Sequence, residues 1–176
     1  MPDQNMWKYR GQERPSFAIQ PGPGQESVWD YPRPPAYVDD PRPVRIEADG
    51  ALLAQAKHAI RALETGSPPA FYLPPSAFDQ SLLRPSSRKT YCEWKGEAQY
   101  FDVITPARTI EAAVWCYPEP KPGAEKIAGW YSCYPEQLEC FVGDEAVQAQ
   151  AGTYYGGWVT AELVGPWKGE PGTGHW

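Results

Sequence analysis

The stretch Ser-Arg-Lys-Thr-Tyr-Cys-Glu-Trp-Lys-Gly-Glu-Ala-Gln-Tyr-Phe-Asp-Val occupies positions 87–103 and organises the rest of the chain. It combines cationic side chains, a thiol, acids and aromatic rings, with Gly96 near its middle. Aromatic and β-branched residues on both sides of a glycine are typical of a strand, a tight bend and a second strand. The stretch therefore predicts a β-rich domain with a polar and aromatic pocket.

Composition extends this prediction to the whole chain. The 176 residues suffice for one domain with a buried core. They include 21 prolines, against an average usage of about 5%, and prolines interrupt helices and central strands. The 8 tryptophans and 11 tyrosines favour strands. We expect a mainly β fold: a single domain of short, twisted antiparallel strands with one or two short helices and long Pro/Gly-rich loops.

The charge distribution bears on the partners. A net charge of −6 and a pI near 5.0 argue against binding of nucleic acid or of an anionic membrane. Residues 84–95 nevertheless carry four cations and one acid, Glu93. This window suits an anionic small molecule; alternatively, it is a solvated strand edge whose charges prevent aggregation.

No secretory signal is visible in residues 1–7, and no apolar stretch approaches 18 residues. None of the cysteines forms a C-x-x-C pair, so we expect no metal site and no cofactor. We interpret them as reduced thiols of a cytoplasmic protein. They are Cys92, Cys116, Cys133 and Cys140.

Residues 1–24 are polar and rich in proline and glycine, which predicts an extended arm before a single β-rich domain at 25–176. Four apolar side chains could anchor the arm: Trp7, Tyr9, Phe17 and Ile19. The anchor is either the main body or a second subunit, and in the second case the arm makes a homodimer.

The segment after the arm gives one hairpin and one ambiguous element. Val44–Glu47 predicts a strand, Asp49-Gly50 a type I′ turn and Leu52–Gln55 the returning strand. Lys57–Leu63 predicts a helix. A single helix over Ala51–Glu64 is the alternative, because its apolar residues also fit a period of 3.6.

Further elements follow from short apolar runs between turn residues. Ser76 is predicted to cap a helical turn through Leu83. A final hairpin is predicted to turn at Gly143-Asp144-Glu145. The strands expected are Ala70–Leu73, Thr90–Trp94, Glu97–Val103, Thr109–Trp115, Ala128–Tyr134, Leu138–Val142 and Ala146–Gln148.

Pieces of sequence in a fixed order resemble the family called domain of unknown function 427, which some classifications label nucleotidyltransferase-like. They are Glu26–Pro35, Ala62–Thr65, Tyr72–Pro75, Cys92–Gly96, Tyr134-Pro135, Tyr154–Thr160 and Gly165–Trp176. The resemblance implies a mostly β fold in an Mss4-like, β-tent arrangement, and it brings no settled activity. Zinc sites of that fold use paired C-x-x-C motifs, which are absent here. Neither an Asp-x-Asp pair nor a phosphate-binding loop supports nucleotidyl transfer.

The residues at the bend suggest a binding site. Lys95 precedes Gly96, where backbone can approach a ligand closely, and Arg88 offers a fork to carboxylate or phosphate. Such a set suits a small anionic or aromatic ligand. Alternatively, Lys95 forms a surface ion pair with Glu93, Glu97 or Glu64. The candidate ligand-binding residues are Arg88, Cys92, Trp94, Lys95, Tyr72, Tyr117, Tyr155 and Trp158.

Cys92 is also a candidate nucleophile, since neighbouring cations favour a thiolate. It stands three residues before Lys95, so the two side chains should point to opposite faces of a strand unless the chain bends. Three classes therefore stay open: a binding domain for an unknown small molecule, an enzyme that uses the same pocket, and an interaction or homodimerisation module that uses the arm.

Overall fold

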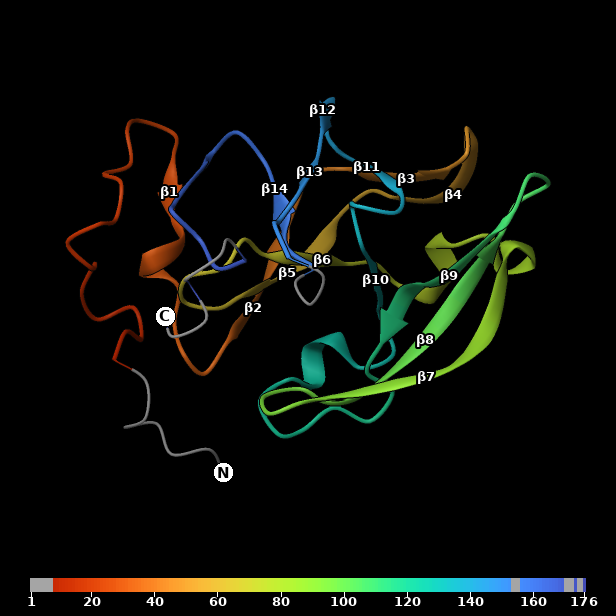
Figure 1. Ribbon diagram of the computed structural model, residues 1–176, viewed down its shortest axis with the longest axis horizontal. Coiled ribbons are helices and arrows are strands. Elements are labelled where there is room, and N and C mark those ends of the chain that lie inside the picture. The colour runs from red at the N-terminus through yellow and green to blue at the C-terminus, as the bar shows by residue number, and fades with distance from the viewer. Residues whose placement is uncertain (1–7, 153–155, 170–172, 174–175) are drawn as a thin grey trace.

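The computed structural model describes residues 8–152, 156–169, 173 and 176. The described chain consists of short strands, mostly antiparallel, joined by turns and three-residue 3₁₀ helices (Figure 1). The prediction of a mainly β fold is confirmed. The strands are β1 (Glu26–Ser27), β2 (Ala36–Asp40), β3 (Val44–Ala48), β4 (Ala51–Ala56), β5 (Ala59–Leu63), β6 (Ala70–Tyr72), β7 (Leu83–Cys92), β8 (Gly96–Ile104), β9 (Thr109–Cys116), β10 (Tyr131–Cys133), β11 (Glu139–Val142), β12 (Glu145–Ala146), β13 (Gln148–Ala149), β14 (Trp158–Val159) and β15 (Leu163–Val164). The 3₁₀ helices are η2 (Val28–Asp30), η3 (Pro75–Ala77), η4 (Gln80–Leu82) and η5 (Glu125–Ile127).

Three larger sheets and two small pairs make up the architecture. One sheet has the strand order β10-β9-β8-β7, a second β12-β11-β3-β4 and a third β2-β5-β6. The long β7, β8 and β9 form one side of the molecule, and β1 with the N-terminal segment lies at the other end (Figure 1). Leu73, directly after β6, pairs with Tyr131 of β10 through two hydrogen bonds of 2.8 Å. This bridge joins the first sheet to the third.

The β3–β4 hairpin forms as predicted. Asp49 and Gly50 have φ angles of +50° and +83°, as a type I′ turn requires. The predicted helix over Lys57–Leu63 is wrong, as is the longer helix over Ala51–Glu64, because β5 pairs with both β2 and β6. A central strand is covered on both faces, so its nearly continuous apolar run cannot be distinguished from a helix by periodicity.

Two local predictions also need correction. Asp79, rather than Ser76, caps a 3₁₀ turn, accepting a hydrogen bond of 3.1 Å from the backbone N–H of Ser81. The last hairpin turns at Gly143-Asp144 alone, and Glu145 already pairs with Val142.

The strand predicted at Ala128–Tyr134 begins only at Tyr131. The preceding residues form η5, and Gly129, with a φ of +71°, turns the chain into β10. Local turn geometry therefore shortens the strand that its apolar residues suggested.

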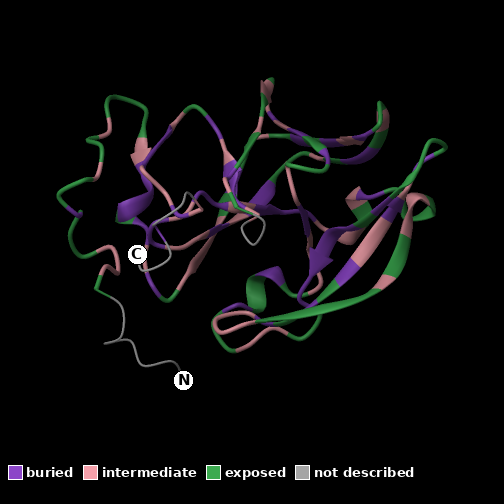
Figure 2. Ribbon diagram, in the orientation of Figure 1, coloured by how far each residue is buried: buried purple, intermediate pink, exposed green. Residues whose placement is uncertain are grey.

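Buried residues gather in β5, β6 and β9, whereas β7 is largely exposed along its length (Figure 2). The main core lies between the sheets and includes Ile46, Phe71, Val114 and Trp158. A second cluster around Tyr72 and the aromatic residues of β8 and β9 forms one wall of the cavity described below.

The segment 8–24 packs on the body of its own chain. The rings of Tyr9 and Phe17 meet Trp29 of η2 edge-on, with centroids 5.7 and 5.4 Å apart. The backbone N–H of Ile19 donates to the carbonyl of Gly165 at 2.8 Å, while its side chain stays exposed. Trp7, the fourth predicted anchor, lies outside the described residues.

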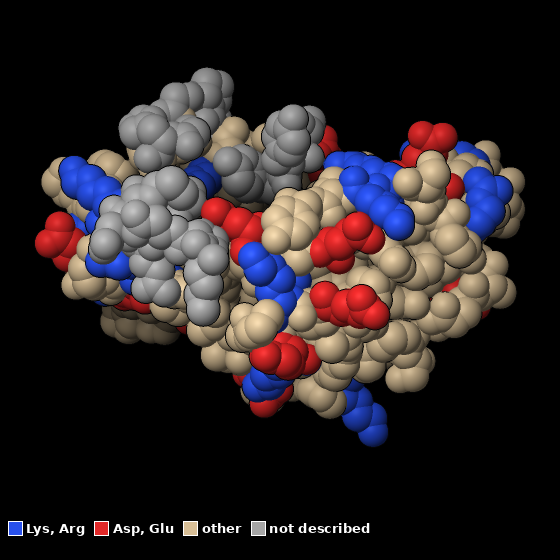
Figure 3. All heavy atoms as spheres, turned by 90° about the horizontal axis from the view of Figure 1, so that it is seen from below, with Lys and Arg blue, Asp and Glu red and all other residues tan. Residues whose placement is uncertain are grey.

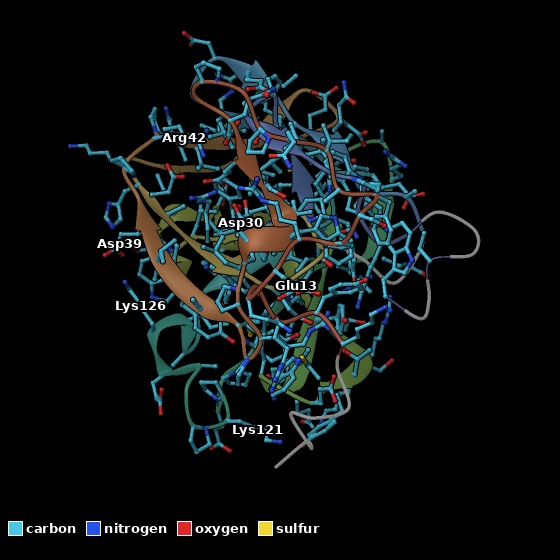
Figure 4. The ribbon with its side chains drawn as sticks, turned by 90° about the vertical axis from the view of Figure 1, so that its left-hand side faces the viewer. Glu13, Asp30, Asp39, Arg42, Lys121 and Lys126 are labelled. Carbon is cyan, nitrogen blue, oxygen red and sulfur yellow. The ribbon has the colours of Figure 1, made fainter. Side chains whose placement is uncertain are left out.

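Ion pairs fasten the ends of the strands. Arg42 binds Asp40 and Glu162 at 2.7 Å each, which ties the end of β2 to the C-terminal segment. Lys126 of η5 donates to Asp39 of β2 at 3.1 Å, and Figure 4 shows these two side chains next to each other. No helix in the described part of the chain is both long and apolar enough to cross a membrane.

Candidate functional site

The bend predicted at Gly96 is the turn between β7 and β8. Cys92 and Gly96 pair across the two strands, so the turn consists of Glu93, Trp94 and Lys95. Gly96 has a φ of +102°, which favours glycine. Lys121 supports the turn from outside: its backbone N–H donates to the carbonyl of Lys95 and its Nζ to that of Glu93, both at 2.9 Å.

A cavity of about 360 Å³ lies on the inner side of this turn, between β5–β6 and the β7–β9 sheet. Five tyrosines and Trp115 contribute to its lining, together with both predicted cations, Arg88 and Lys95. The volume lies in the range of pockets that hold small molecules. The lining tyrosines are Tyr72, Tyr91, Tyr100, Tyr117 and Tyr134.

Lys95 and Cys92 both line this cavity, and the Nζ of Lys95 lies 3.9 Å from the Sγ of Cys92. The chain bends between them, so the expectation for an unbroken strand does not apply. Burial lowers the pKa of Lys95, but Cys92 and Glu64 raise it, and the net shift is upward. The half-buried ammonium is therefore a permanent cation at neutral pH.

Arg88 lines the cavity from the part of β7 where the register shifts, between Pro85 and Lys89. Its guanidinium lies over the ring of Tyr100, 4.6 Å from the centroid. No carboxylate of the described chain lies within salt-bridge distance of it. The fork is therefore available to a ligand anion.

Hydroxyl groups in the cavity wall form hydrogen bonds with one another. Thr90 and Tyr100 share a hydrogen bond of 2.8 Å, and the hydroxyls of Tyr100 and Tyr134 lie 3.4 Å apart. Trp115 donates its Nε1–H to the hydroxyl of Tyr72 at 3.2 Å. Burial is the main cause of the raised pKa of Tyr72 and Tyr134, so both stay protonated and can donate hydrogen bonds to a ligand.

Glu64 is the one carboxylate among the described lining residues, and cations surround it. Arg33 approaches it to 3.6 Å, and its charge acts on both Lys95 and Lys168. These lysines occupy the same place in the two Trp-Lys-Gly-Glu sequences, at 94–97 and 167–170. The region is thus locally positive, whereas on the face in Figure 3 Lys and Arg are interspersed with Asp and Glu.

Lys168 should make stability depend on alkaline pH. Burial, and then the charge of Arg33, lowers the pKa of Lys168 from 10.5 to about 8. Between pH 8 and 10.5 the unfolded chain binds more protons at this lysine than the folded one, so its contribution to stability rises with pH. Lys168→Met lacks this titration, so we expect the free energy of unfolding of wild type to rise relative to that of Lys168→Met by about 1–2 kcal/mol between pH 7 and 10.

Urea unfolding of wild type and of Lys168→Met at several pH values measures this difference in free energy. Both proteins contain the same cysteines and tyrosines, so the titrations of those residues cancel in the difference. The exposed Lys89→Met is the matched control and should change little with pH. Parallel stability curves for Lys168→Met and wild type would show that Lys168 titrates normally.

The structure brings five of the eight predicted ligand-binding residues to the cavity: Tyr72, Arg88, Cys92, Lys95 and Tyr117. Trp94 instead lines a smaller hollow of about 140 Å³ beside Pro34, Pro35 and Tyr37. Trp158 is fully buried, stacked on Phe71 in the core, so it contacts no ligand space. Tyr155 lies outside the described residues.

Sequence reasoning did not place Glu64, Tyr100 and Tyr134 in the cavity wall. A signal for Tyr100 was present: Gly96, Ala98 and Tyr100 alternate on β8 and are all buried, so they share one face. Glu64 had no comparable signal, because it follows β5 and reaches the site only through the pairing of the sheets. Among the described residues, no group of three or more His, Cys, Asp or Glu side chains could hold a metal ion.

The backbone next to β14 passes close to the cavity wall. A Cβ on Gly156 would lie 2.3 Å from the Trp115 ring, and one on Gly157 would lie 2.7 Å from the carbonyl of Pro68. Only glycine permits these approaches, so this pair of glycines closes one side of the cavity.

Comparison with known families gives one match. A family model described as a domain of unknown function (DUF427) matches residues 36–144, more than half of the chain. The matched region includes Glu64, Arg88, Cys92 and Lys95. No curated protein matches the chain.

Proposed function

Since this chain belongs to the DUF427 family, whose description assigns no activity, we propose from the cavity itself that the protein binds a small anionic ligand. Lys95 and Arg88 receive the anionic group, and the tyrosine hydroxyls orient the remainder. The observation that carries the proposal is the position of the Lys95 ammonium in the wall of a ring-lined cavity.

Two features of the site support an anion in particular. Lys95 forms no surface ion pair with Glu93 or Glu97; the partner of Glu97 is Lys89, at 3.6 Å. Arg88 rests on a ring and keeps its N–H groups for other acceptors. Each charge-assisted hydrogen bond contributes about 1.5–3 kcal/mol, so two of them would dominate the orientation of the ligand.

The aromatic lining favours a ligand with a flat body. Tyr72, Trp115 and Tyr117 offer ring faces and edges, and the protonated hydroxyls of the wall supply donors. An aromatic acid meets all of these groups at once. Nucleotidyl transfer has less support, because the described lining has a single carboxylate, Glu64, which Arg33 already engages.

Two predictions made from the sequence are also part of this proposal: a cytoplasmic location and an Mss4-like arrangement of the sheets. All four cysteines are free thiols, which agrees with a reducing compartment. The pair closest to each other, Cys133 and Cys140, has its sulfur atoms 3.4 Å apart without a bond.

A matched pair of probes tests the proposal. We expect 4-hydroxybenzoate to bind wild type at least about tenfold more tightly than 4-hydroxybenzamide, because one charge-assisted contact distinguishes them. In Lys95→Met this preference should disappear. Isothermal titration calorimetry measures both affinities, and native mass spectrometry of fresh protein shows any ligand that copurifies.

Lys89→Met is the control, since Lys89 lies on the same strand, is exposed and does not line the cavity. It should keep the preference for the acid. Equal binding of acid and amide by wild type, or an unchanged preference in Lys95→Met, would overturn the proposal.

A further inference from the structure

Cys92 differs from the other three cysteines in its surroundings. Cys116, Cys133 and Cys140 are buried in the cores, with exposed fractions of 4%, 0% and 2%. Cys92 is only half-buried and lines the cavity beside Lys95. The protein therefore presents one thiol to the space in which we place an anion.

The distance between the Lys95 ammonium and the Cys92 thiol defines which reagent can contact both. A carboxylate bound to an ammonium lies about 2.7–2.9 Å from its nitrogen, and an attacked carbon lies about 3–3.5 Å from its nucleophile. With Nζ and Sγ 3.9 Å apart, a carboxylate on Lys95 holds its own neighbouring carbon within reach of Cys92. Arg88, on the same strand, lines the same cavity.

We propose that Cys92 is a nucleophilic thiol that captures a short 2-substituted carboxylic acid with a leaving group on the carbon next to the carboxylate. This inference rests on the proposed anion-binding function. The sulfur lone pair forms the S–C bond while the bond between carbon and leaving group breaks. The leaving group departs with its electron pair, and the thiol proton passes to solvent.

The protonation states of the cavity residues agree with Cys92 as the nucleophile and with Lys95 and Arg88 as the groups that bind the anion. Lys95 cannot be the nucleophile, because its raised pKa keeps the nitrogen protonated and without a free lone pair. Tyr72 and Tyr117 lie within electrostatic range of Cys92, and burial raises the pKa of both, so they stay neutral and do not repel an incoming anion. Lys95 and Arg88 thus select the reagent, and Cys92 reacts with it.

Iodoacetate and iodoacetamide test the inference, since both alkylate the same thiolate by displacement of iodide and differ mainly in charge. The rate of each at every cysteine is measured by peptide mass spectrometry in native and in urea-unfolded protein. We expect the ratio of the iodoacetate rate to the iodoacetamide rate at Cys92 to be at least about tenfold higher in the native protein. The three buried cysteines are internal controls and should react slowly with both reagents.

The raised ratio should fall to the unfolded value in Lys95→Met and decrease in Arg88→Met, but persist in Lys89→Met. Arg88 is exposed, so its variant should fold even if Lys95→Met is unstable. A native ratio at Cys92 equal to the unfolded one overturns the inference.

Two readouts on wild type separate this inference from the proposed function. The alkylation ratio at Cys92 reports on capture by the thiol, and the preference for 4-hydroxybenzoate over its amide reports on anion binding. If wild type prefers the acid but shows no raised alkylation ratio, the capture proposal fails and anion binding stands. If neither preference exists, both fail.

Discussion

Replacement of Trp158 by alanine is expected to lower the free energy of unfolding by about 3–5 kcal/mol. The side chain is fully buried, stacks on Phe71 with ring centroids 5.0 Å apart, and donates its Nε1–H to the carbonyl of Cys133 at 3.0 Å. Alanine leaves a cavity and an unpaired buried carbonyl. The neighbouring Gly157, packed against Pro68, leaves the backbone little room to close that cavity.

Urea unfolding, monitored by circular dichroism, measures this loss as a lower urea concentration at the transition midpoint, with an unchanged dependence of the free energy on urea concentration. Trp158→Phe is the matched control: it keeps the stack on Phe71, loses the hydrogen bond and should cost clearly less. A loss below about 1 kcal/mol in Trp158→Ala would mean that the stack contributes little to the core.

Replacement of Trp29 by alanine should have an effect of similar size, about 3–5 kcal/mol, but with a local consequence. Trp29 is fully buried, and its Nε1–H donates to the carbonyl of Pro166 at 2.7 Å. The rings of Tyr9, Phe17 and Trp176 contact it with centroid distances of 5.4–5.7 Å. One side chain thus holds both the arm and the C-terminal segment.

Limited trypsin digestion distinguishes this local effect from general destabilisation. Cleavage after Arg10 should become much faster in Trp29→Ala, under conditions in which the folded core remains intact. Ile19→Ala changes an exposed arm residue and serves as the control, with no expected increase. Lower stability without faster cleavage at Arg10 would show that other contacts hold the arm. One such contact is the ion pair of Arg14 with Asp30, at 2.7 Å; Asp30 is labelled in Figure 4.

The attachment of the arm also bears on the interaction module that the sequence left open. Tyr9 and Phe17 use their rings within their own chain. A second subunit would have to displace these contacts before it could use the same side chains. Size-exclusion chromatography of Trp29→Ala beside wild type would show whether a freed arm joins two copies.

Part of the candidate site followed from local sequence. A strand, a turn and a second strand form around Gly96 as predicted, because glycine takes the positive φ that this position needs. The first strand, predicted as Thr90–Trp94, is instead Leu83–Cys92, and Trp94 lies in the turn. Three of the predicted ligand-binding residues, Arg88, Cys92 and Lys95, belong to this one hairpin, so their short separation in sequence keeps them near each other. The convergence of Lys95 and Cys92 was not predictable, because it depends on which residues the turn contains.

The rest of the site depends on contacts between sheets. Tyr72 belongs to the β2-β5-β6 sheet and Glu64 directly follows β5, and the Leu73–Tyr131 bridge places that sheet against β10. Nothing in the local sequence specifies this contact. For the same reason the prediction of Trp158 as a ligand-binding residue is wrong: packing on Phe71 places it in the core.

The sequence by itself determined the class of the fold and two of its turns. Prolines and aromatic residues act on the local backbone, so they disfavour long helices and favour short strands, and Asp49-Gly50 and Gly96 take the φ angles that their turns require. Only the tertiary structure decided that β5 is a strand, that Trp158 is a core residue and that Cys92 faces Lys95. Those outcomes depend on sheet pairing and burial, in which residues distant in sequence cover each other's surfaces and override local preference.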